Sequence, residues 1–478
     1  MPRRACVVIL PLLLLPFLVS AADKKRPLNP QTRAQLETIL GYLEAALARV
    51  GDVQAKDSLH SSLAKLYGQL GELGLARQNL ETMGQPTSRD FALGSLACSQ
   101  AEAGDFLQAR MTAAEIGTQY ERGRALGCVA RKQVQAGRLN EALATAAEID
   151  DPQARSDTLL LLGLALARQK QQIDSENVLA QAAEAARQME YPGDQAWQLL
   201  NVAEAQKRAG QEINMQHTLG WARRAIDQVQ VQDTKDRLLG RLAALQTKLG
   251  LEGEAYVTEG DIEDSQHRWE PRAAHAAKQA QRGDSAGVLS LIDNADPPVS
   301  QEEENARAWA LEKVAQAQAN AGDYLTAREV INRIPANHPA RAHTLANLAQ
   351  LLWWRGNDQE ADSAFEEALD TASRVEDPGM RAQALRIVAG NLGETNQAER
   401  ALGVLQRIDR ENERRNALSS IALSRGRRGE TEAALDWILR VEEPVEQAQA
   451  LLGLAHGLIL FDQHGPPRPR PQPASRPN

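Results

Sequence analysis

Tryptophan and arginine side chains that helix packing does not require are the residues of this chain most suited to recognition chemistry. Trp353 stands four residues after Ala349, at a place where the corresponding helices mostly carry glycine, alanine or valine. Trp309 and Arg386 belong to the preceding and following helices. Two rings and a planar guanidinium could hold an extended peptide, with the cation pairing a carboxylate or stacking on a ring. The alternative is that Trp353 fills a gap between helices and that Trp354 lies on the adjoining helix face.

Motifs for catalysis or metal binding are absent from the sequence. It contains no Gly-x-Gly-x-x-Gly after a strand, no phosphate-binding loop, no His-Glu-x-x-His and no Gly-x-Ser-x-Gly. His338 and His343 lack a paired ligand set, and the acidic stretch from Asp261 to His267 is better explained as a solvated helix end. We therefore expect no enzyme activity, no cofactor and no metal site.

The charge balance argues against a nucleic-acid partner. The 478 residues carry a net charge of -9, and only 4% of them are aromatic. Covering a phosphate backbone requires a basic stripe of lysine and arginine. The abundant alanine and leucine instead suit close packing between helices.

Helix-turn-helix units recur along the chain. In residues 306–334, apolar positions at helical spacing form one face up to Gly322, and a second apolar face begins after Asp323, which can cap a new helix. Such a pair cannot bury its apolar face alone, so the units must stack. Each unit has a small residue midway along its first helix, 33 to 40 residues from the next: Ala64, Ala97, Ala130, Gly163, Ala203, Ala243, Ala276, Ala315, Ala349, Ala389, Ala422 and Ala455. A turn position follows seven residues later: Gly71, Gly104, Gly137, Lys170, Gly210, Gly250, Gly283, Gly322, Gly356, Asn396 and Gly429.

This spacing resembles the tetratricopeptide repeat, which has a small residue in its first helix, a glycine turn seven residues later and an alanine five residues beyond. The second small residue stands here at Ala76, Ala109, Ala142, Ser175, Ala255, Ala327, Ala361, Ala401 and Ala434. The resemblance covers about residues 57 to 461. It implies an all-α fold: a right-handed α-α superhelical solenoid of about eleven helix-turn-helix repeats with capping helices at its ends. The aromatic residue that the family usually has three positions after the small one is kept at Tyr67 but is glutamine in six units.

The resemblance also implies a concave groove that binds a protein or peptide. The groove positions lie six and three residues before the small residue and one and four residues after it. Here they include Trp197, Trp309, Trp353, Arg131 and Arg386, beside Phe91, Arg124, Lys207, Arg237, Glu312, Gln316 and Gln350. Those first five residues and Trp354 are our candidates for partner binding.

The longer spacings of 39 and 40 residues predict longer second helices. In these units alanine replaces the residue that ends the shorter helices, at Ala182, Ala222 and Ala368, so the helix should continue. The unit before Ala315 is the expected exception, because Pro297 and Pro298 force a loop. Ser300 and Glu303 then form the sequence of a capping box for the next helix.

The first residues of the chain have the pattern of an export signal. Residues 1–22 combine Arg3 and Arg4 with an apolar run and small residues before Asp23, where cleavage is expected. An uncleaved anchor is the alternative. We expect a bacterial periplasmic or secreted protein with no membrane insertion once the signal is removed.

Three further segments complete the predicted organisation. Residues 23–56 should form a linker and a helix that covers the open end of the stack, 57–463 the solenoid, and 464–478 a proline-rich disordered tail. Cys98 and Cys128 are expected to be two small buried thiols, although export would permit a disulfide.

Two functions are consistent with these features. The first is a non-enzymatic scaffold that binds a protein or peptide in its concave groove. The second is a targeting or assembly subunit for a cell-envelope enzyme, acting on peptidoglycan or polysaccharide, or for a secretion system. The repeats themselves do not choose between them, because this kind of fold is a general binding scaffold.

Overall fold

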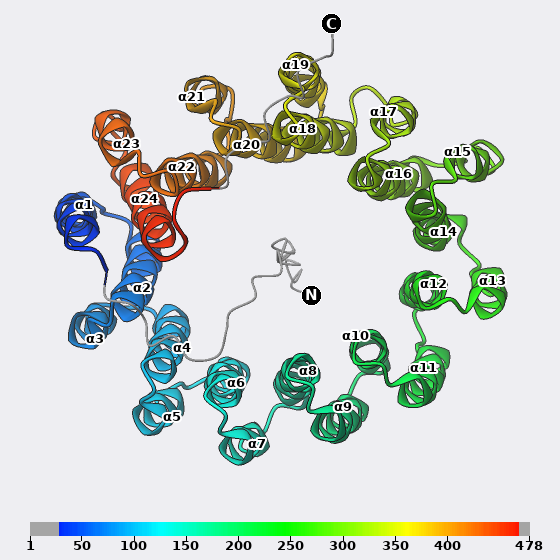
Figure 1. The fold of residues 1–478 in the computed structure, drawn as a ribbon, viewed down its shortest axis with the longest axis horizontal. Coiled ribbons are helices and arrows are strands. Elements are labelled where there is room, and N and C mark those ends of the chain that lie inside the picture. The colour runs from blue at the N-terminus through cyan, green and yellow to red at the C-terminus, as the bar shows by residue number, and fades with distance from the viewer. Residues whose placement is uncertain (1–27, 468–478) are drawn as a thin grey trace, which may run out of the picture.

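The computed structural model describes residues 28–467, and the regular structure within that range is entirely helical. The even-numbered helices form an inner layer and the odd-numbered helices an outer layer (Figure 1). The inner helices are α2 (Val53–Leu70), α4 (Pro86–Glu102), α6 (Gln119–Gln135), α8 (Pro152–Arg168), α10 (Pro192–Arg208), α12 (Gln232–Leu249), α14 (Trp269–Gln281), α16 (Gln301–Ala321), α18 (Pro339–Trp354), α20 (Pro378–Glu394), α22 (Glu411–Gly426) and α24 (Pro444–His464). The outer helices are α1 (Pro30–Ala48), α3 (Leu73–Glu81), α5 (Phe106–Ala114), α7 (Leu139–Ala147), α9 (Gln172–Arg187), α11 (Glu212–Asp227), α13 (Glu252–Gly260), α15 (Ser285–Asp293), α17 (Tyr324–Asn332), α19 (Asp358–Arg374), α21 (Ala398–Leu405) and α23 (Thr431–Ile438), and a short 3-10 helix, η1 (Ser265–Arg268), precedes α14.

The predicted turn positions are confirmed by the backbone. All nine turn glycines have a φ between 75° and 87°, a left-handed conformation that glycine adopts without steric cost. Lys170 and Asn396 occupy the same place with φ of 62° and 61°. The change of direction after each inner helix is therefore encoded at one position per unit.

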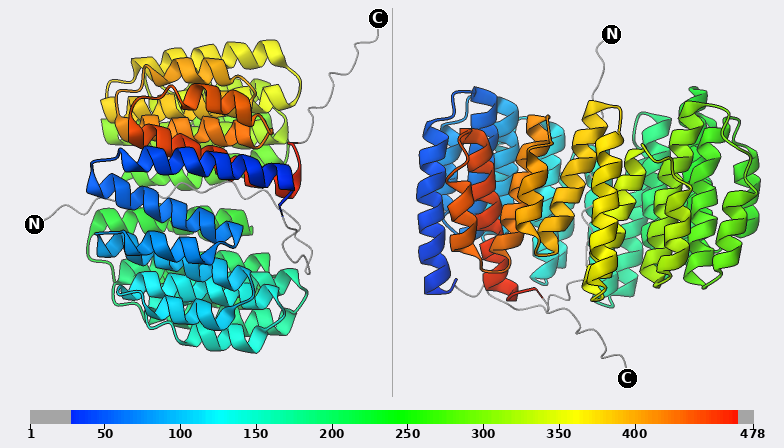
Figure 2. Two further views of the ribbon diagram at one scale, coloured as in Figure 1. Left: turned by 90° about the vertical axis from the view of Figure 1, so that its left-hand side faces the viewer. Right: turned by 90° about the horizontal axis from the view of Figure 1, so that it is seen from above.

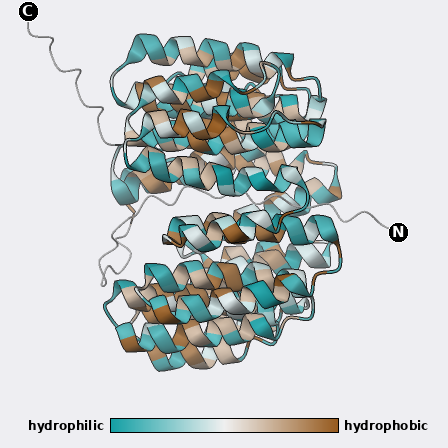
Figure 3. Cartoon of the chain, turned by 90° about the vertical axis from the view of Figure 1, so that its right-hand side faces the viewer, coloured by the Kyte–Doolittle hydropathy of each residue, from teal (hydrophilic) through white to brown (hydrophobic). Residues whose placement is uncertain are grey.

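The predicted small residues lie at the contact between the two helices of a unit. The eleven alanines of this set are at most 1% exposed. At Gly163 an added Cβ would lie 2.5 Å from Leu179 Cγ of the paired outer helix. A larger side chain would therefore force the two helices apart, which is the reason for the repeated small residue. Hydrophobic and hydrophilic residues are interspersed along the helices (Figure 3).

The predicted differences in helix length are also confirmed. The outer helices α9, α11 and α19 have 16 or 17 residues, whereas α3, α5, α7, α13, α15 and α17 have nine. At the start of α16 the Glu303 N–H donates to Ser300 Oγ at 3.0 Å. The Glu303 carboxylate in turn accepts from the Val299 N–H at 3.0 Å, one residue before the place that a capping box uses.

Buried aspartates brace the loops between successive units. Asp90 of α4 accepts hydrogen bonds from the N–H groups of Gly117 and Thr118 at 3.0 and 2.9 Å. Asp57 of α2 does the same for Gly84 and its neighbour, Gln85. These carboxylates accept hydrogen bonds from backbone N–H groups just before the next inner helix begins. They therefore help to fix the orientation of that helix relative to the preceding unit.

The helix stack closes on itself, which corrects our expectation of a stack with open ends. Helix α1 packs chiefly against α24, and α24 also contacts α2 (Figures 1 and 2). The Asn29 N–H donates to Asp462 Oδ1 at 3.1 Å, and the Arg49 guanidinium donates to Gln447 Oε1. Helix α1 is therefore not a cap over an exposed end. It supplies the outer partner that α24 lacks, so the apolar faces of the two terminal helices bury each other.

Glycine residues allow the close contact between α22 and α24, the last two inner helices before the ring closes. Helices α22 and α24 approach so closely that a Cβ on Gly457 would lie 2.9 Å from Gly426 Cα and from Arg427 N, and closer still to the Leu423 carbonyl oxygen. Gly453, one turn earlier on α24, faces α22 with the same closeness, since a Cβ there would lie 3.0 Å from Ser419 C. The two helices thus meet backbone to backbone.

The ends of the chain are only partly covered by the described residues. The predicted export signal at residues 1–22 lies outside them, as do residues 468–478 of the predicted tail at 464–478. Helix α2 begins at Val53, four residues before our boundary at 57. Between residues 28 and 467, no helix combines the length and the apolar character that crossing a membrane requires.

Candidate functional site

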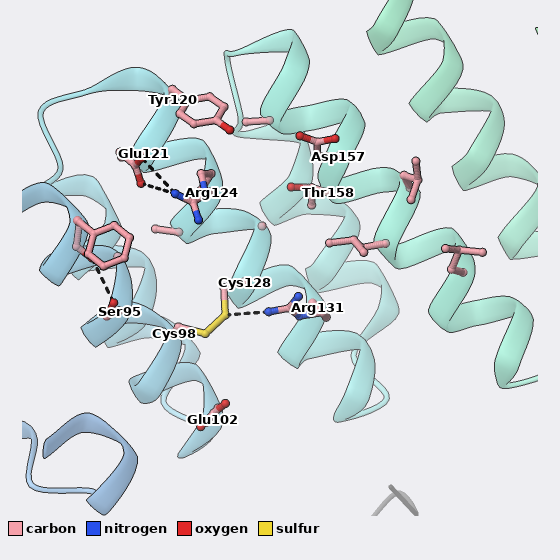
Figure 4. A pocket seen from close by; sticks show the side chains of 18 of the residues that line it. Ser95, Cys98, Glu102, Tyr120, Glu121, Arg124, Cys128, Arg131, Asp157 and Thr158 are labelled. Carbon is pink, nitrogen blue, oxygen red and sulfur yellow. Dashed lines mark hydrogen bonds and ion pairs between the residues drawn. A yellow bond between two sulfur atoms is a disulfide. The ribbon is translucent and has the colours of Figure 1, made fainter. Parts of the chain in front are cut away.

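A cavity of about 750 Å³ lies on the inner layer, across the five helices from α2 to α10 (Figure 4). Its lining repeats the same positions in successive units, counted from each small residue. Six before it stand Phe91, Arg124 and Asp157; two before it Ser95, Cys128, Leu161 and Asn201; one after it Lys65, Cys98, Arg131, Leu164 and Glu204; and five after it Gln69, Glu102 and Arg208. The cavity is therefore a continuous band along one face of each inner helix, as spacings of three and four residues require.

This band corrects the groove positions that the sequence suggested. The positions six before, three before and one after the small residue do line the cavity, the second of them through Gly94, Gly127 and Leu160, whereas the position four after it is replaced by the position five after it. The position two before the small residue was missed, although a three-residue step from the position one after it would have found it. At roughly 100° per residue, the band is rotated by about 50° from the predicted one.

Three large apolar side chains of the cavity are exposed. Phe91, Tyr120 and Leu161 have 47%, 42% and 44% of their surface accessible to solvent, and each belongs to a different inner helix. Single exposed apolar residues are ordinary on a protein surface, but several that converge in one concave site are typical of a binding site.

The charged groups of the cavity are balanced and mostly paired within the band. Arg124 donates to Glu121 at 3.1 Å, and Arg208 pairs with Glu204 at 2.7 Å. Burial raises the pKa of Asp157, whose Oδ1 accepts from the amide of Gln198 at 2.8 Å. Burial likewise raises the pKa of Tyr120, so its hydroxyl is a neutral donor at physiological pH. The cavity thus offers hydrogen-bond donors and acceptors together with charges of both signs, rather than a surface of one charge.

A disulfide bond lies within the cavity and corrects our expectation of two buried thiols. Cys98 of α4 and Cys128 of α6 are joined, with their Cα atoms 5.5 Å apart, within the range that disulfides span. The Arg131 guanidinium lies 3.5 Å from Cys128 Sγ (Figure 4). The two cysteines stand at inner-band positions of consecutive units, so stacking of the units brings them together. Sequence spacing alone could not show this.

Two of the predicted site residues belong to this half of the ring. Arg131 lines the cavity. Trp197 of α10 is 45% exposed, and Arg241 of α12 stacks over its ring with the guanidinium carbon 3.6 Å from the ring centroid. Trp197 stands one turn before Asn201, which lines the end of the cavity. These two candidates are brought into one region.

Trp309 forms a separate cluster on the far side of the ring. Its ring meets those of His338 and His343 at centroid distances of 5.3 and 5.5 Å. Glu312 Oε1 lies 3.9 Å from His343 Nδ1. Burial raises the pKa of Glu312 to about 7 and lowers the pKa of each of these histidines to about 4. At neutral pH both imidazoles are therefore uncharged, and Trp309 is half-buried among them.

The remaining predicted residues lie on α18 and α20. Trp353 and Trp354 are both half-buried and meet edge to face at 5.0 Å. Trp353 packs against the hydrophobic core, whereas Trp354 stands five residues after Ala349 and so corresponds to Glu102 and Arg208 of the cavity. Arg386 is ion-paired with Glu413 of α22 at 2.5 Å. The structure thus does not unite all six predicted residues in one groove, and the partner-binding role of each stays a prediction.

Metal ligation finds no support in the part of the chain that the structure describes, where no group of three or more histidine, cysteine or acidic side chains could hold an ion. The acidic stretch before α14 is engaged locally: Asp264 accepts from the Gln266 N–H, and His267 pairs with Asp233 at 3.0 Å.

Fold and cavity together define an all-helical repeat protein with a cavity on its inner face. The crystal structure of Ton1535 from Thermococcus onnurineus NA1 is 18% identical, covers 68% of this chain and 97% of that one, and has a TM-score of 0.30. A circular tandem repeat protein with novel repeat topology and enhanced subunit contact surfaces is 14% identical, covers 90% of this chain and 98% of that one, and has a TM-score of 0.20. TM-scores of this size carry no argument about the function of this chain. No protein-family model matches the chain, and the search of curated proteins returns no match.

Proposed function

We propose that this protein is a non-enzymatic scaffold that binds an extended peptide segment of a partner protein along its inner face. The observation that carries the proposal is the exposure of Phe91, Tyr120 and Leu161 in one cavity. Covering such side chains yields roughly 25 cal/mol for each Å² of apolar surface removed from water. A peptide would supply the apolar groups to cover them.

The polar groups of the band favour a peptide over a purely apolar ligand. The amide of Asn201, the half-buried carboxylate of Asp157 and the hydroxyl of Tyr120 line the cavity together with its apolar side chains. An extended peptide presents a backbone donor and acceptor at every residue, for which these polar groups are suitable partners. The repeat spacing then adds several weak contacts along one chain.

The finer parts of the assignment are also proposals. The helix pairs are proposed to be diverged tetratricopeptide-like repeats, about eleven in number, whose right-handed superhelix has closed on itself. The basic start and apolar run of residues 1–22 support export to the periplasm or beyond it. The partner would accordingly be another exported protein.

Peptide selection against the mature protein tests the binding proposal. A displayed random-peptide library should yield binders, and Leu161→Ala and Tyr120→Ala should each weaken a selected peptide at least tenfold, about 1.4 kcal/mol. The matched controls are Leu107→Ala and Tyr191→Ala, because Leu107 and Tyr191 are 72% and 64% exposed outside the cavity. Equal losses in both pairs of variants, or no selected peptide, would refute the assignment of the cavity.

A further inference from the structure

The Cys98–Cys128 bond is placed where a disulfide can react rather than only brace the fold. Both cysteines line the cavity (Figure 4), and they join adjacent inner helices, not a surface loop. Cys98 is half-buried and Cys128 is 9% exposed, so Cys98 is the sulfur that an incoming group can reach.

The surroundings of the two sulfur atoms differ in charge. The Arg131 guanidinium lies 3.5 Å from Cys128 Sγ and forms no ion pair within residues 28–467. A guanidinium beside a sulfur atom stabilises its thiolate form. Glu102, one turn after Cys98 on α4, is instead neutralised by Lys132 at 2.8 Å. Arg131 therefore directs a positive charge at Cys128.

This asymmetry fixes the direction in which the bond should open. In thiol–disulfide exchange the attacked sulfur forms the new bond, and the other sulfur leaves as a thiolate. The sulfur with the better stabilised thiolate leaves faster. Accessibility makes Cys98 the attacked atom, and Arg131 makes Cys128 the leaving group.

We propose that the cavity is a thiol–disulfide exchange site that captures a thiol-bearing peptide as a mixed disulfide on Cys98. The peptide thiolate attacks Cys98 Sγ, the Cys98–Cys128 bond breaks, and its electron pair leaves on Cys128 Sγ beside Arg131. The products are a peptide–Cys98 disulfide and a Cys128 thiolate. Attack of that thiolate on Cys98 Sγ reverses the step, so the peptide is held reversibly and no external oxidant or reductant is consumed.

The test uses reduced glutathione as the thiol and the folded, oxidised mature protein. After acid quenching, remaining thiols are alkylated and peptides are mapped by mass spectrometry. We expect glutathione on Cys98 and a free, alkylated Cys128. The Arg131→Gln variant should open more slowly, by roughly threefold for each unit by which the pKa of the leaving thiol rises. Arg122→Gln is the control, since Arg122 lies on the same helix, pairs with Asp150 at 3.6 Å and does not line the cavity.

Four results would overturn the proposal. They are two free thiols in the protein unfolded without reductant, glutathione mainly on Cys128, equal opening rates in the Arg131→Gln and Arg122→Gln variants, and a bond that millimolar glutathione opens only after unfolding. The last result would assign the disulfide a purely bracing role between α4 and α6. Because glutathione reports on the sulfur chemistry alone, none of these results depends on the peptide-binding experiment above.

Discussion

Replacing Gly457 by alanine probes the backbone contact that precedes ring closure. The added Cβ would lie 2.9 Å from Gly426 Cα and from Arg427 N. Ordinary contacts between carbon atoms need about 3.5–4.0 Å, so the helices must separate by roughly an ångström. Side-chain rotation cannot relieve this strain, because the opposing atoms are backbone.

The expected size of the effect follows from a matched substitution. Gly390→Ala on α20 adds the same methyl group to a helix, but its Cβ would meet nothing within 4 Å. In an open helix position, alanine stabilises by about 1 kcal/mol relative to glycine. Overpacking costs about 1–3 kcal/mol. Because the helix-propensity gain is common to both variants, Gly457→Ala should be about 1–3 kcal/mol less stable than Gly390→Ala.

Urea unfolding followed by circular dichroism at 222 nm measures this difference. Gly390→Ala should have a midpoint at or above that of the wild type, and Gly457→Ala a midpoint clearly below that of Gly390→Ala. If Gly457→Ala unfolds at the same urea concentration as Gly390→Ala, α22 and α24 do not meet backbone to backbone, and the closure described above is wrong.

Four further outcomes are expected. Ala349→Leu should cost about 1–3 kcal/mol of stability, because Ala349 is fully buried, whereas Glu360→Leu at an exposed position should change it by less than about 0.5 kcal/mol, and equal melting temperatures would mean that the repeat register is wrong. Burial raises the pKa of Glu312 from 4.5 to about 7, so between these pH values the folded state binds more protons than the unfolded state, and the protein loses stability as the pH rises through this window. The free energy of unfolding of Glu312→Gln, measured by denaturant titration, should therefore increase by about 1–3 kcal/mol relative to that of the wild type between pH 4.5 and pH 8. Parallel pH profiles would contradict the burial of this carboxyl. Trp353→Ala should lower the melting temperature if the ring is core, as its packing indicates, while a tenfold loss of peptide binding at unchanged stability would instead make it a site residue. Mass spectrometry of the exported protein should find an N-terminus near Asp23, and recovery of intact Met1 in the cytoplasm would contradict the signal.

Local features of the fold could be predicted from the sequence because each is encoded within one unit. The turn positions from Gly71 to Gly429 all adopt a positive φ, and the small residues from Ala64 to Ala455 are all buried. The long outer helices were predicted as well, since an alanine such as Ala182 leaves the helix with no residue that ends it. These outcomes depend on contacts between two helices joined by a short turn.

Features between units needed the tertiary structure. The rotation of one unit on the next is set by side-chain packing and by braces such as Asp90. It places the position of Trp354, and not that of Trp353, in line with the inner band of the cavity. The same rotation placed Cys98 beside Cys128.

The sequence by itself determined the helical units, their register and the lengths of their helices, because each is fixed by neighbours along the chain. Only the tertiary structure decided that the stack closes, with α1 packed on α24 and Asn29 bonded to Asp462. The physical reason is that closure depends on the total of the small rotations between successive units, and this total cannot be read from the residues of any single unit. The inner cavity and its disulfide follow from the same summed geometry.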